Sequence, residues 1–188
     1  MSKLKISEIV FIAVVSASLG IFWWGYTFFY DLCKPLLKPL ALENLLGGIW
    51  LMGALFFPYI IRKPGSALLG EVIAAFIQGF IARWGITSLL WGLVQALPVE
   101  LFFLLLAYKR WNLWVLCLAG MISATASYAL SVVWERYYLL SLPFNLIQWG
   151  SFLLSSILLG AVFSKWLADN LAKTGALNQF AIVRKDLE

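Results

Sequence analysis

Histidine does not occur anywhere in the sequence, and charged residues account for only 12% of its 188 positions. This absence excludes a histidine base and a histidine-bound metal, two of the commonest chemical devices in proteins. The only cysteines are Cys33 and Cys117. The topology described below places them near opposite membrane faces, so we expect two free thiols and no disulfide. The sequence also lacks a G-x-x-x-x-G-K-[ST] phosphate loop, so any energy from ATP must come from a partner.

Apolar residues are what the sequence has in excess. They make up 63% of the chain, whereas a soluble domain is about half apolar and about a quarter charged. Without a low-complexity block or a repeat, the simplest expectation is one integral membrane domain over residues 1–188. Its first apolar stretch, about Ile9 to Tyr30, is too long for the core of a signal peptide. We therefore interpret it as a spanning helix and not as a cleaved leader.

The fold class that follows is an all-α membrane protein with six transmembrane helices. A spanning helix needs roughly 17–25 mostly apolar residues, and prolines, glycines and charges separate the segments that qualify. The second of them is the shortest and the least secure. The expected spans are residues 7–30, 45–61, 66–83, 87–107, 113–134 and 144–168.

The lysine and arginine residues set the expected orientation. With the N-terminus inside, ten of the fourteen, Lys185 among them, lie on the cytoplasmic side, and the other four lie outside. The positive-inside rule then predicts that both termini are cytoplasmic. The net charge of +5 is mostly this orientation signal, so we do not expect nucleic-acid binding. The four outer residues are Lys34, Lys38, Arg83 and Arg136.

Two segments lie outside the expected spans. The stretch from Asp31 to Asn44 contains two prolines and four charges, and we expect a long outer loop there. A lid over a binding site and a plain connector explain such a loop equally well. Beyond about Ala176 the chain becomes polar, and we expect that tail to fray.

Ionisable side chains within a span are costly and usually face the protein interior. Glu71 and Gln78 lie seven residues apart in the third span, about 20° from each other around the helix, and Trp84 follows at the outer end. We expect Glu71 to meet either a polar ligand or a helix-anchoring hydrogen bond. It lies toward the cytoplasmic half. If it anchors helices, Glu135 or Glu43 near the outer rim becomes the better counter-charge for a ligand.

Three further spans carry amide, hydroxyl or aromatic groups in their outer halves. In the fourth span Trp91 and Gln95 share a face, whereas Glu100 lies about 140° from Gln95 and is a weaker candidate. This mixture is typical of a small-molecule pocket, and it suits a flat heterocycle that is cationic or bears an amino group. The fifth and sixth spans add Tyr128, Trp134, Asn145, Gln148 and Trp149.

Tryptophans also gather in belts at membrane interfaces, and this alternative weakens every tryptophan assignment. The pocket candidates Trp84, Trp91, Trp134 and Trp149 fit a belt equally well. The amides discriminate better, because an amide that faces lipid has no hydrogen-bond partner. The tryptophans that we assign to belts are Trp23, Trp24, Trp111, Trp114 and Trp166.

The first span contains Ala13 and Ala17 in small-x-x-x-small spacing, which lets another helix approach closely. Ordinary internal packing explains such a motif when it stands alone. Two longer stretches, KPGSALLGEVIAAFIQG and WGITSLLWGLVQALPVELFF, are more specific. With the six spans, the alanine motif and the long first loop, they resemble the substrate-binding S components of energy-coupling factor (ECF) vitamin transporters, and more closely the YkoE group.

The resemblance covers most of the chain and implies a role in vitamin uptake. It implies a high-affinity site for thiamine or hydroxymethylpyrimidine near the outer side, in the plasma membrane of a prokaryote. It also implies a transmembrane coupling protein and two cytosolic ATPases as partners, with Ala13 and Ala17 in contact with the coupling protein. The segment from Asp31 to Asn44 would serve as the gate.

Two other classes of function remain open. A membrane enzyme would have few catalytic groups beyond a glutamate base, because histidine is absent and the two cysteines lie far apart in the sequence. An assembly protein without its own small-molecule cargo would use the small-residue faces to hold other helices. Ligand binding by the isolated protein separates the transporter subunit from the assembly protein, and substrate turnover would identify an enzyme.

Overall fold

The structure, a computed structural model, describes residues 3–184, and within that range it is built from helices. Lys185, which the orientation argument counted on the cytoplasmic side, lies outside the described residues. The elements in chain order are α1 (Ile6–Leu37), η1 (Lys38–Leu40), η2 (Glu43–Leu51), α2 (Met52–Ile61), α3 (Ser66–Ile81), α4 (Thr87–Leu105), α5 (Leu113–Trp134), η3 (Tyr137–Leu139), α6 (Leu142–Ser155), η4 (Ser156–Val162) and α7 (Phe163–Lys173).

These elements form six rods, since η2 continues into α2, and α6 continues through η4 into α7. Five rods are long and apolar enough to cross a membrane, and α3 is a shorter apolar helix of 16 residues. The all-helical prediction is therefore confirmed. The ranking of the spans was wrong in one respect: the second rod has 19 residues, and α3 is the shortest.

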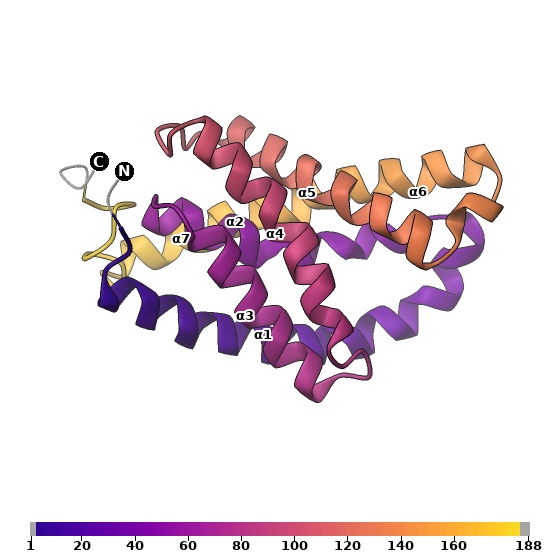
Figure 1. The fold of residues 1–188 in the computed structure, drawn as a ribbon, viewed down its shortest axis with the longest axis horizontal. Helices are drawn as coiled ribbons and strands as arrows, with labels where there is room; N and C mark the ends of the chain where they lie inside the picture. Colours follow the sequence, from indigo (N-terminus) through magenta and orange to yellow (C-terminus); the bar gives the residue numbers. More distant parts are fainter. Residues whose placement is uncertain (1–2, 185–188) are drawn as a thin grey trace.

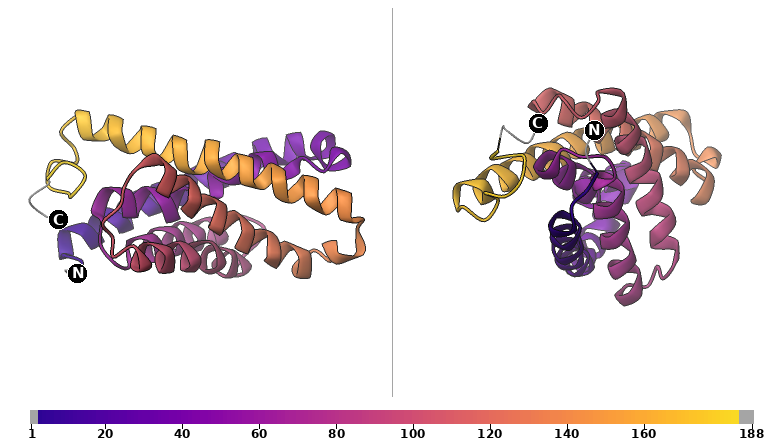
Figure 2. Two further views of the ribbon diagram at one scale, coloured as in Figure 1. Left: turned by 90° about the horizontal axis from the view of Figure 1, so that it is seen from above. Right: turned by 60° about the vertical axis from the view of Figure 1, so that its left-hand side comes forward.

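The rods lie side by side along the long axis of the molecule, with α3 and α4 crossing it obliquely (Figure 1). The α6–η4–α7 rod runs almost the whole length, and both described ends of the chain lie at the same end of the bundle (Figure 2). Helix α2 is central, and all of its residues from Met52 to Ile61 are buried. The shared end agrees with an even number of crossings. Its placement in the cytoplasm stays a prediction.

The predicted outer loop from Asp31 to Asn44 is wrong, because most of this segment is helical. Helix α1 continues to Leu37 with Pro35 inside it, and η1 follows directly. The φ of proline is helical, so α1 continues through Pro35 although the ring removes one intrahelical hydrogen bond. Ala41 then takes a left-handed conformation with φ of 58°, which reverses the chain into η2. Prolines and charges, usual loop signals, here lie on an exposed extension of a long helix.

The tail beyond Ala176 also differs from the expectation, because its apolar residues are buried. Leu177 and Phe180 are each 1% exposed, and the Phe180 ring lies 4.4 Å from the Phe11 ring of α1. The backbone N–H of Ile182 donates to the carbonyl oxygen of Ile60 at 3.0 Å. The few apolar residues of a mainly polar tail therefore close one end of the bundle.

Two carboxylates tie the helices together at the end where the termini lie. Glu8 of α1 forms a buried ion pair with Lys63, which lies between α2 and α3; Lys63 Nζ is 2.7 Å from Glu8 Oε1. Glu100 of α4 accepts the backbone N–H groups of Gly65, Ala67 and Leu68, which are free donors at the start of α3. Glu100, the weaker ligand candidate in the fourth span, therefore binds backbone donors of α3.

Segment η2 passes very close to α6 just before the π-helical segment η4 begins. The Oγ of Ser155, which precedes it, accepts from Gly48 N at 2.8 Å and donates to the carbonyl oxygen of Leu45 at 2.7 Å. A Cβ at Gly48 would lie 2.1 Å from the carbonyl oxygen of Ser155. Gly48 is therefore required where η2 passes α6.

Replacing Gly48 with alanine is expected to destabilise the fold by about 1–3 kcal/mol, because the added methyl group must push two backbones apart. Thermal unfolding in detergent measures the effect. Gly25→Ala is the matched control, since nothing lies within 4 Å of its Cβ position, and alanine there should be neutral or stabilising by about 0.5–1 kcal/mol. Equal melting temperatures for the two variants would contradict the close contact.

Candidate ligand-binding cavity

A cavity of about 240 Å³ lies at the end of the bundle away from the termini. Its walls come from the second half of α1, the end of α3 and the turn after it, the first half of α4, the end of α5 with η3, the segment η2, and the later part of α6. The volume is below the roughly 300–1,000 Å³ of sites that enclose drug-sized molecules. The cavity therefore suits a small ligand.

Aromatic rings make up much of the cavity wall. Trp50 of η2 stands edge-on to Tyr30 of α1, with ring centroids 5.1 Å apart, and edge-on to Trp84 at 6.3 Å. Trp23 is held in place because its Nε1 donates to the carbonyl oxygen of Ile49 at 2.9 Å. Rings fixed in this way offer flat faces for stacking against a planar ligand. The aromatic residues of the wall are Trp23, Tyr30, Trp50, Trp84, Trp91, Trp134, Tyr137 and Phe152.

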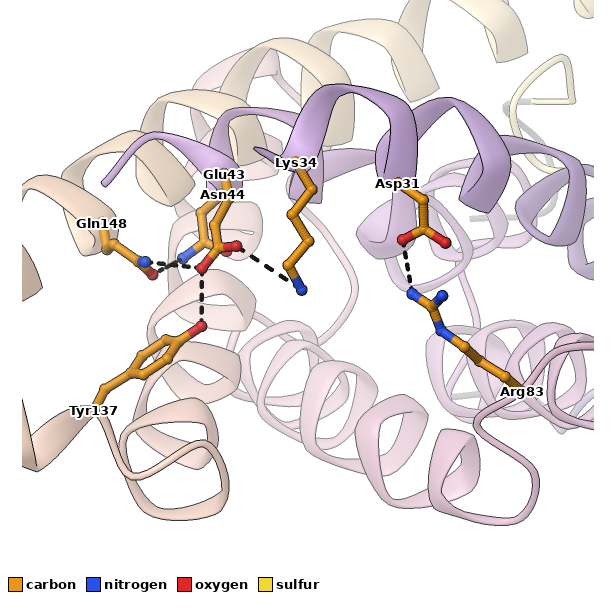
Figure 3. A network of polar contacts seen from close by, with 7 residues as sticks. All are labelled: Asp31, Lys34, Glu43, Asn44, Arg83, Tyr137 and Gln148. Carbon is orange, nitrogen blue, oxygen red and sulfur yellow. Dashed lines mark hydrogen bonds and ion pairs between the residues drawn. The ribbon is translucent and has the colours of Figure 1, made fainter. Parts of the chain in front are cut away.

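A buried carboxylate, that of Glu43, is the centre of a polar network beside the cavity (Figure 3). Glu43, 1% exposed, accepts from Gln148 Nε2 at 2.9 Å and from the Tyr137 hydroxyl at 3.0 Å, both through Oε1. Gln148 Oε1 in turn accepts from Asn44 Nδ2 at 2.9 Å. Burial, together with the Glu43 charge, raises the pKa of Tyr137, which keeps its hydroxyl protonated as a donor. This network joins η2, η3 and α6.

Three charged side chains lie on the wall near the mouth, namely Lys34, Arg83 and Glu135. Arg83 Nη2 contacts Asp31 Oδ1 at 2.7 Å, and Lys34 Nζ lies 3.9 Å from Glu43 Oε2. Figure 3 shows both basic side chains reaching between α1 and its neighbours. The two basic side chains are each paired with an acidic residue. Glu135 is the acidic residue that lies on the wall itself, so its carboxylate is the best placed to meet a positive ligand.

Five of the ten residues expected to bind a ligand line this cavity. They come from α3, the turn after it, α4 and α5. The shared face expected for Trp91 and Gln95 is present, as both lie on the wall with Gly92 between them. The five are Gln78, Trp84, Trp91, Gln95 and Trp134.

Glu71 lies behind the cavity wall and is fully buried. Its Oε2 accepts the backbone N–H of Ala54 at 2.7 Å, at the point where the 3₁₀ turns of η2 become α2. The Gly53 N–H also bonds to this carboxylate. Free backbone donors at a helix start favour a carboxylate there. Of the two partners expected for Glu71, the structure shows the helix-anchoring one.

The remaining candidates also lie outside the cavity wall. The Tyr128 hydroxyl donates to Asn145 Oδ1 at 2.6 Å, and the Trp149 indole donates to Thr125 Oγ1 at 3.2 Å. These two contacts join α5 to α6. Gln148 is not on the wall, but it accepts a hydrogen bond from Asn44, which does line the cavity.

Several wall residues were missed or misassigned from the sequence. Trp23 was assigned to a membrane belt, but it is 1% exposed and lines the cavity. Trp50 lies in a 3₁₀ segment, whose side-chain periodicity differs from the α-helical one. Ser127 and Ser88 were not among the residues expected to bind a ligand. Both residues line the cavity, and their buried Oγ atoms have no hydrogen-bond partner among residues 3–184.

Ala13 and Ala17, the expected partner-binding residues, lie half-buried on α1. Val10 and Val14 of the same helix are 55% and 62% exposed, so the helix presents an apolar surface around the motif. Within the described part of the chain, no group of three or more Cys, Asp and Glu residues could hold a metal ion. Cys33 and Cys117 are free thiols, as expected.

Comparisons with known proteins point in one direction. Residues 7–126 match a family described as "ABC-type cobalt transport system, permease component". The chain is 34% identical to the putative HMP/thiamine permease protein YkoE of Bacillus subtilis (strain 168), over 97% of this chain and 92% of that protein. Among solved structures, an S component of an ECF transporter matches with a TM-score of 0.92 at 33% identity, covering 98% of this chain and 93% of the other.

Proposed function

This chain belongs to the S components of ECF transporters, and from that premise we propose that it binds thiamine or hydroxymethylpyrimidine (HMP), the pyrimidine half of thiamine, with high affinity. The relative from Bacillus subtilis carries HMP and thiamine in its name. The fold makes the chain a multi-pass membrane protein. We place it in the plasma membrane of a prokaryote, with the cavity open to the outside.

The cavity is the observation that carries this proposal. Indole faces suit the flat pyrimidine ring, the amides of Gln78 and Gln95 suit its donor and acceptor edge, and the unpartnered hydroxyls of Ser88 and Ser127 add further polar partners. The small volume favours the pyrimidine half in the interior. The cationic thiazolium of thiamine would then lie toward the mouth, near Glu135.

Titration of the purified protein with thiamine and with HMP tests the proposal. Because five of the ten tryptophans line the cavity, binding should give saturable quenching of the intrinsic fluorescence. A folded protein that responds to neither compound would reject this cargo. It would also favour the alternative of a membrane assembly protein without a small-molecule ligand.

The charge of Glu135 gives a sharper prediction, because the two ligands differ in charge. Glu135→Gln should weaken thiamine binding by up to about fivefold, the size expected for an ion pair at an exposed rim. It should leave the affinity for neutral HMP unchanged, so HMP serves as the matched control. Equal losses for both ligands would show that Glu135 acts on the shape of the site and not through its charge.

Delivery into the cell would require partners. We propose that a transmembrane coupling protein meets the α1 surface around Ala13 and Ala17, and that two cytosolic ATPases drive release. This division agrees with the missing phosphate loop. The end of α1 that carries Asp31 and Lys34, with η1 after it, would act as the gate. Two ion pairs connect it to Arg83 and to Glu43 of η2.

A further inference from the structure

Gln95 lines the cavity, and its amide orientation is set from behind. With its Nε2 turned toward the core, it donates to Glu71 Oε1 at 2.8 Å and to the carbonyl oxygen of Trp50 at 3.3 Å. The opposite orientation would bring Gln95 Oε1 against two acceptors. Hydrogen-bond partners are the basis for assigning an amide orientation. The nitrogen of Gln95 thus donates two hydrogen bonds within the protein. Its carbonyl oxygen is the part of the amide that remains for a ligand.

Glu71 cannot turn to accommodate a different orientation, because its other oxygen is fixed. Oε2 accepts the backbone N–H of Ala54, and a Cβ on Gly53 would lie 2.6 Å from it. The side chain is fully buried. The carbonyl oxygen of Trp50, next to the Glu71 oxygen that faces Gln95, has acceptor capacity only, so the Gln95 atom that faces both of them must be the nitrogen. Ala54 therefore fixes Glu71, and Glu71 fixes Gln95.

We propose that Glu71 is a positioning residue, which acts through Gln95 so that the cavity presents a hydrogen-bond acceptor and selects a heterocycle with an amino group over one with an oxo group at the same ring position. The inference rests on the proposed function. A flat ring whose faces meet indoles, such as that of Trp91, meets the amide with its edge. An edge N–H would satisfy the Gln95 oxygen, whereas an edge carbonyl would oppose it.

The substitution Glu71→Gln tests this chain of contacts, because it should reverse the Gln95 amide. The new side chain must keep its oxygen on Ala54 N, so its NH₂ group faces Gln95. Gln95 then turns its own oxygen toward that NH₂ group and its nitrogen toward the cavity, and it gives up its hydrogen bond to the Trp50 carbonyl oxygen. The measurement is the affinity for HMP and for its analogue with the ring amino group replaced by an oxo group. The wild type should prefer the amino compound by about 10- to 100-fold, and the variant should lose or invert that preference.

Gln95→Met supplies the matched control, since it removes both polar atoms and nearly keeps the volume. The preference should disappear in this variant, and adding Glu71→Gln should not change the amino-to-oxo ratio further. A merely structural Glu71 would alter melting temperature and both affinities together. A ratio unchanged by Glu71→Gln in a folded protein would overturn the inference. If that variant does not fold, Gln95→Met decides alone, and a retained amino preference would overturn it.

The wild type separates this inference from the proposed function. Binding of both compounds with equal affinity would leave the proposed function in place and reject the role of Glu71. Binding of neither compound would reject both. A tenfold or larger amino preference that Glu71→Gln abolishes would support both.

Discussion

Replacing Lys63 with methionine is expected to destabilise the protein by about 3–5 kcal/mol, the usual cost of leaving one member of a buried ion pair unpaired. Lys63 Nζ lies 2.7 and 2.9 Å from the two oxygens of Glu8, and both side chains are less than a tenth exposed. Without the ammonium group, the Glu8 charge stays buried between α1 and the turn before α3. The melting temperature should fall by roughly 6–20 °C in a chain of this size.

The molecule offers a control at the same distance. Arg83 and Asp31 also approach to 2.7 Å, but their side chains are 59% and 32% exposed. Arg83→Met should therefore change stability by only about 0.2–1 kcal/mol. The double substitution Glu8→Gln with Lys63→Met should recover most of the loss, because no charge is then left unpaired. Equal losses for Lys63→Met and Arg83→Met would show that burial does not set the strength of these pairs.

Removing the carboxylate of Glu43 is expected to damage both the fold and the cavity. Glu43→Ala leaves the buried Gln148 amide and the Tyr137 hydroxyl without their acceptor, and Lys34 without its partner. Unpaired buried groups cost about 1–3 kcal/mol each, so we expect a loss of roughly 2–4 kcal/mol. Tyr137 belongs to the cavity wall, so ligand affinity should fall as well, by about 10- to 100-fold.

Graded variants separate these effects. Glu43→Gln keeps one acceptor oxygen and should lose less stability than Glu43→Ala. Tyr137→Phe removes a single hydrogen bond and should cost about 1 kcal/mol. Unfolding and ligand titration are measured on the same samples. We expect the loss of stability and the loss of affinity both to be largest for Glu43→Ala, smaller for Glu43→Gln and smallest for Tyr137→Phe. A Glu43→Ala protein that melts and binds like the wild type would show that the network carries no energy.

The sequence predicted the helical framework well, because spanning segments must satisfy a length and a composition. It also placed Trp91 and Gln95 on one face correctly, since helical periodicity alone decides that. It named Gln78 and Gln95, which line the cavity, but it did not separate them from Glu71, Asn145 and Gln148, which do not. Glu71 and Gln95 are neighbours in space, but only one lines the wall. Which of the two lines the cavity depends on the position of η2 and α2 relative to α3 and α4. The periodicity within one helix does not contain that information.

The errors concern backbone conformations and contacts that the local sequence pattern does not reveal. Pro35 is compatible with a helix end, so the predicted loop is helix instead. Trp50 lies in the 3₁₀ segment η2, which turns side chains by a different angle per residue. Trp23 looked like an interfacial residue, yet its indole is buried against the carbonyl of Ile49. Each of these depends on a partner segment that is distant in sequence.

The contact between the tail and α1 has a consequence for biogenesis. Phe11 enters the membrane among the first residues, whereas Phe180, which covers it, is synthesised only after every spanning helix. Folding during synthesis proceeds from the N-terminal side. One face of α1 and the carbonyl oxygen of Ile60 therefore stay exposed until the tail has been synthesised. Nascent chains halted before residue 177 should be more sensitive to proteases at this end. The tail therefore acts as a closing step of assembly.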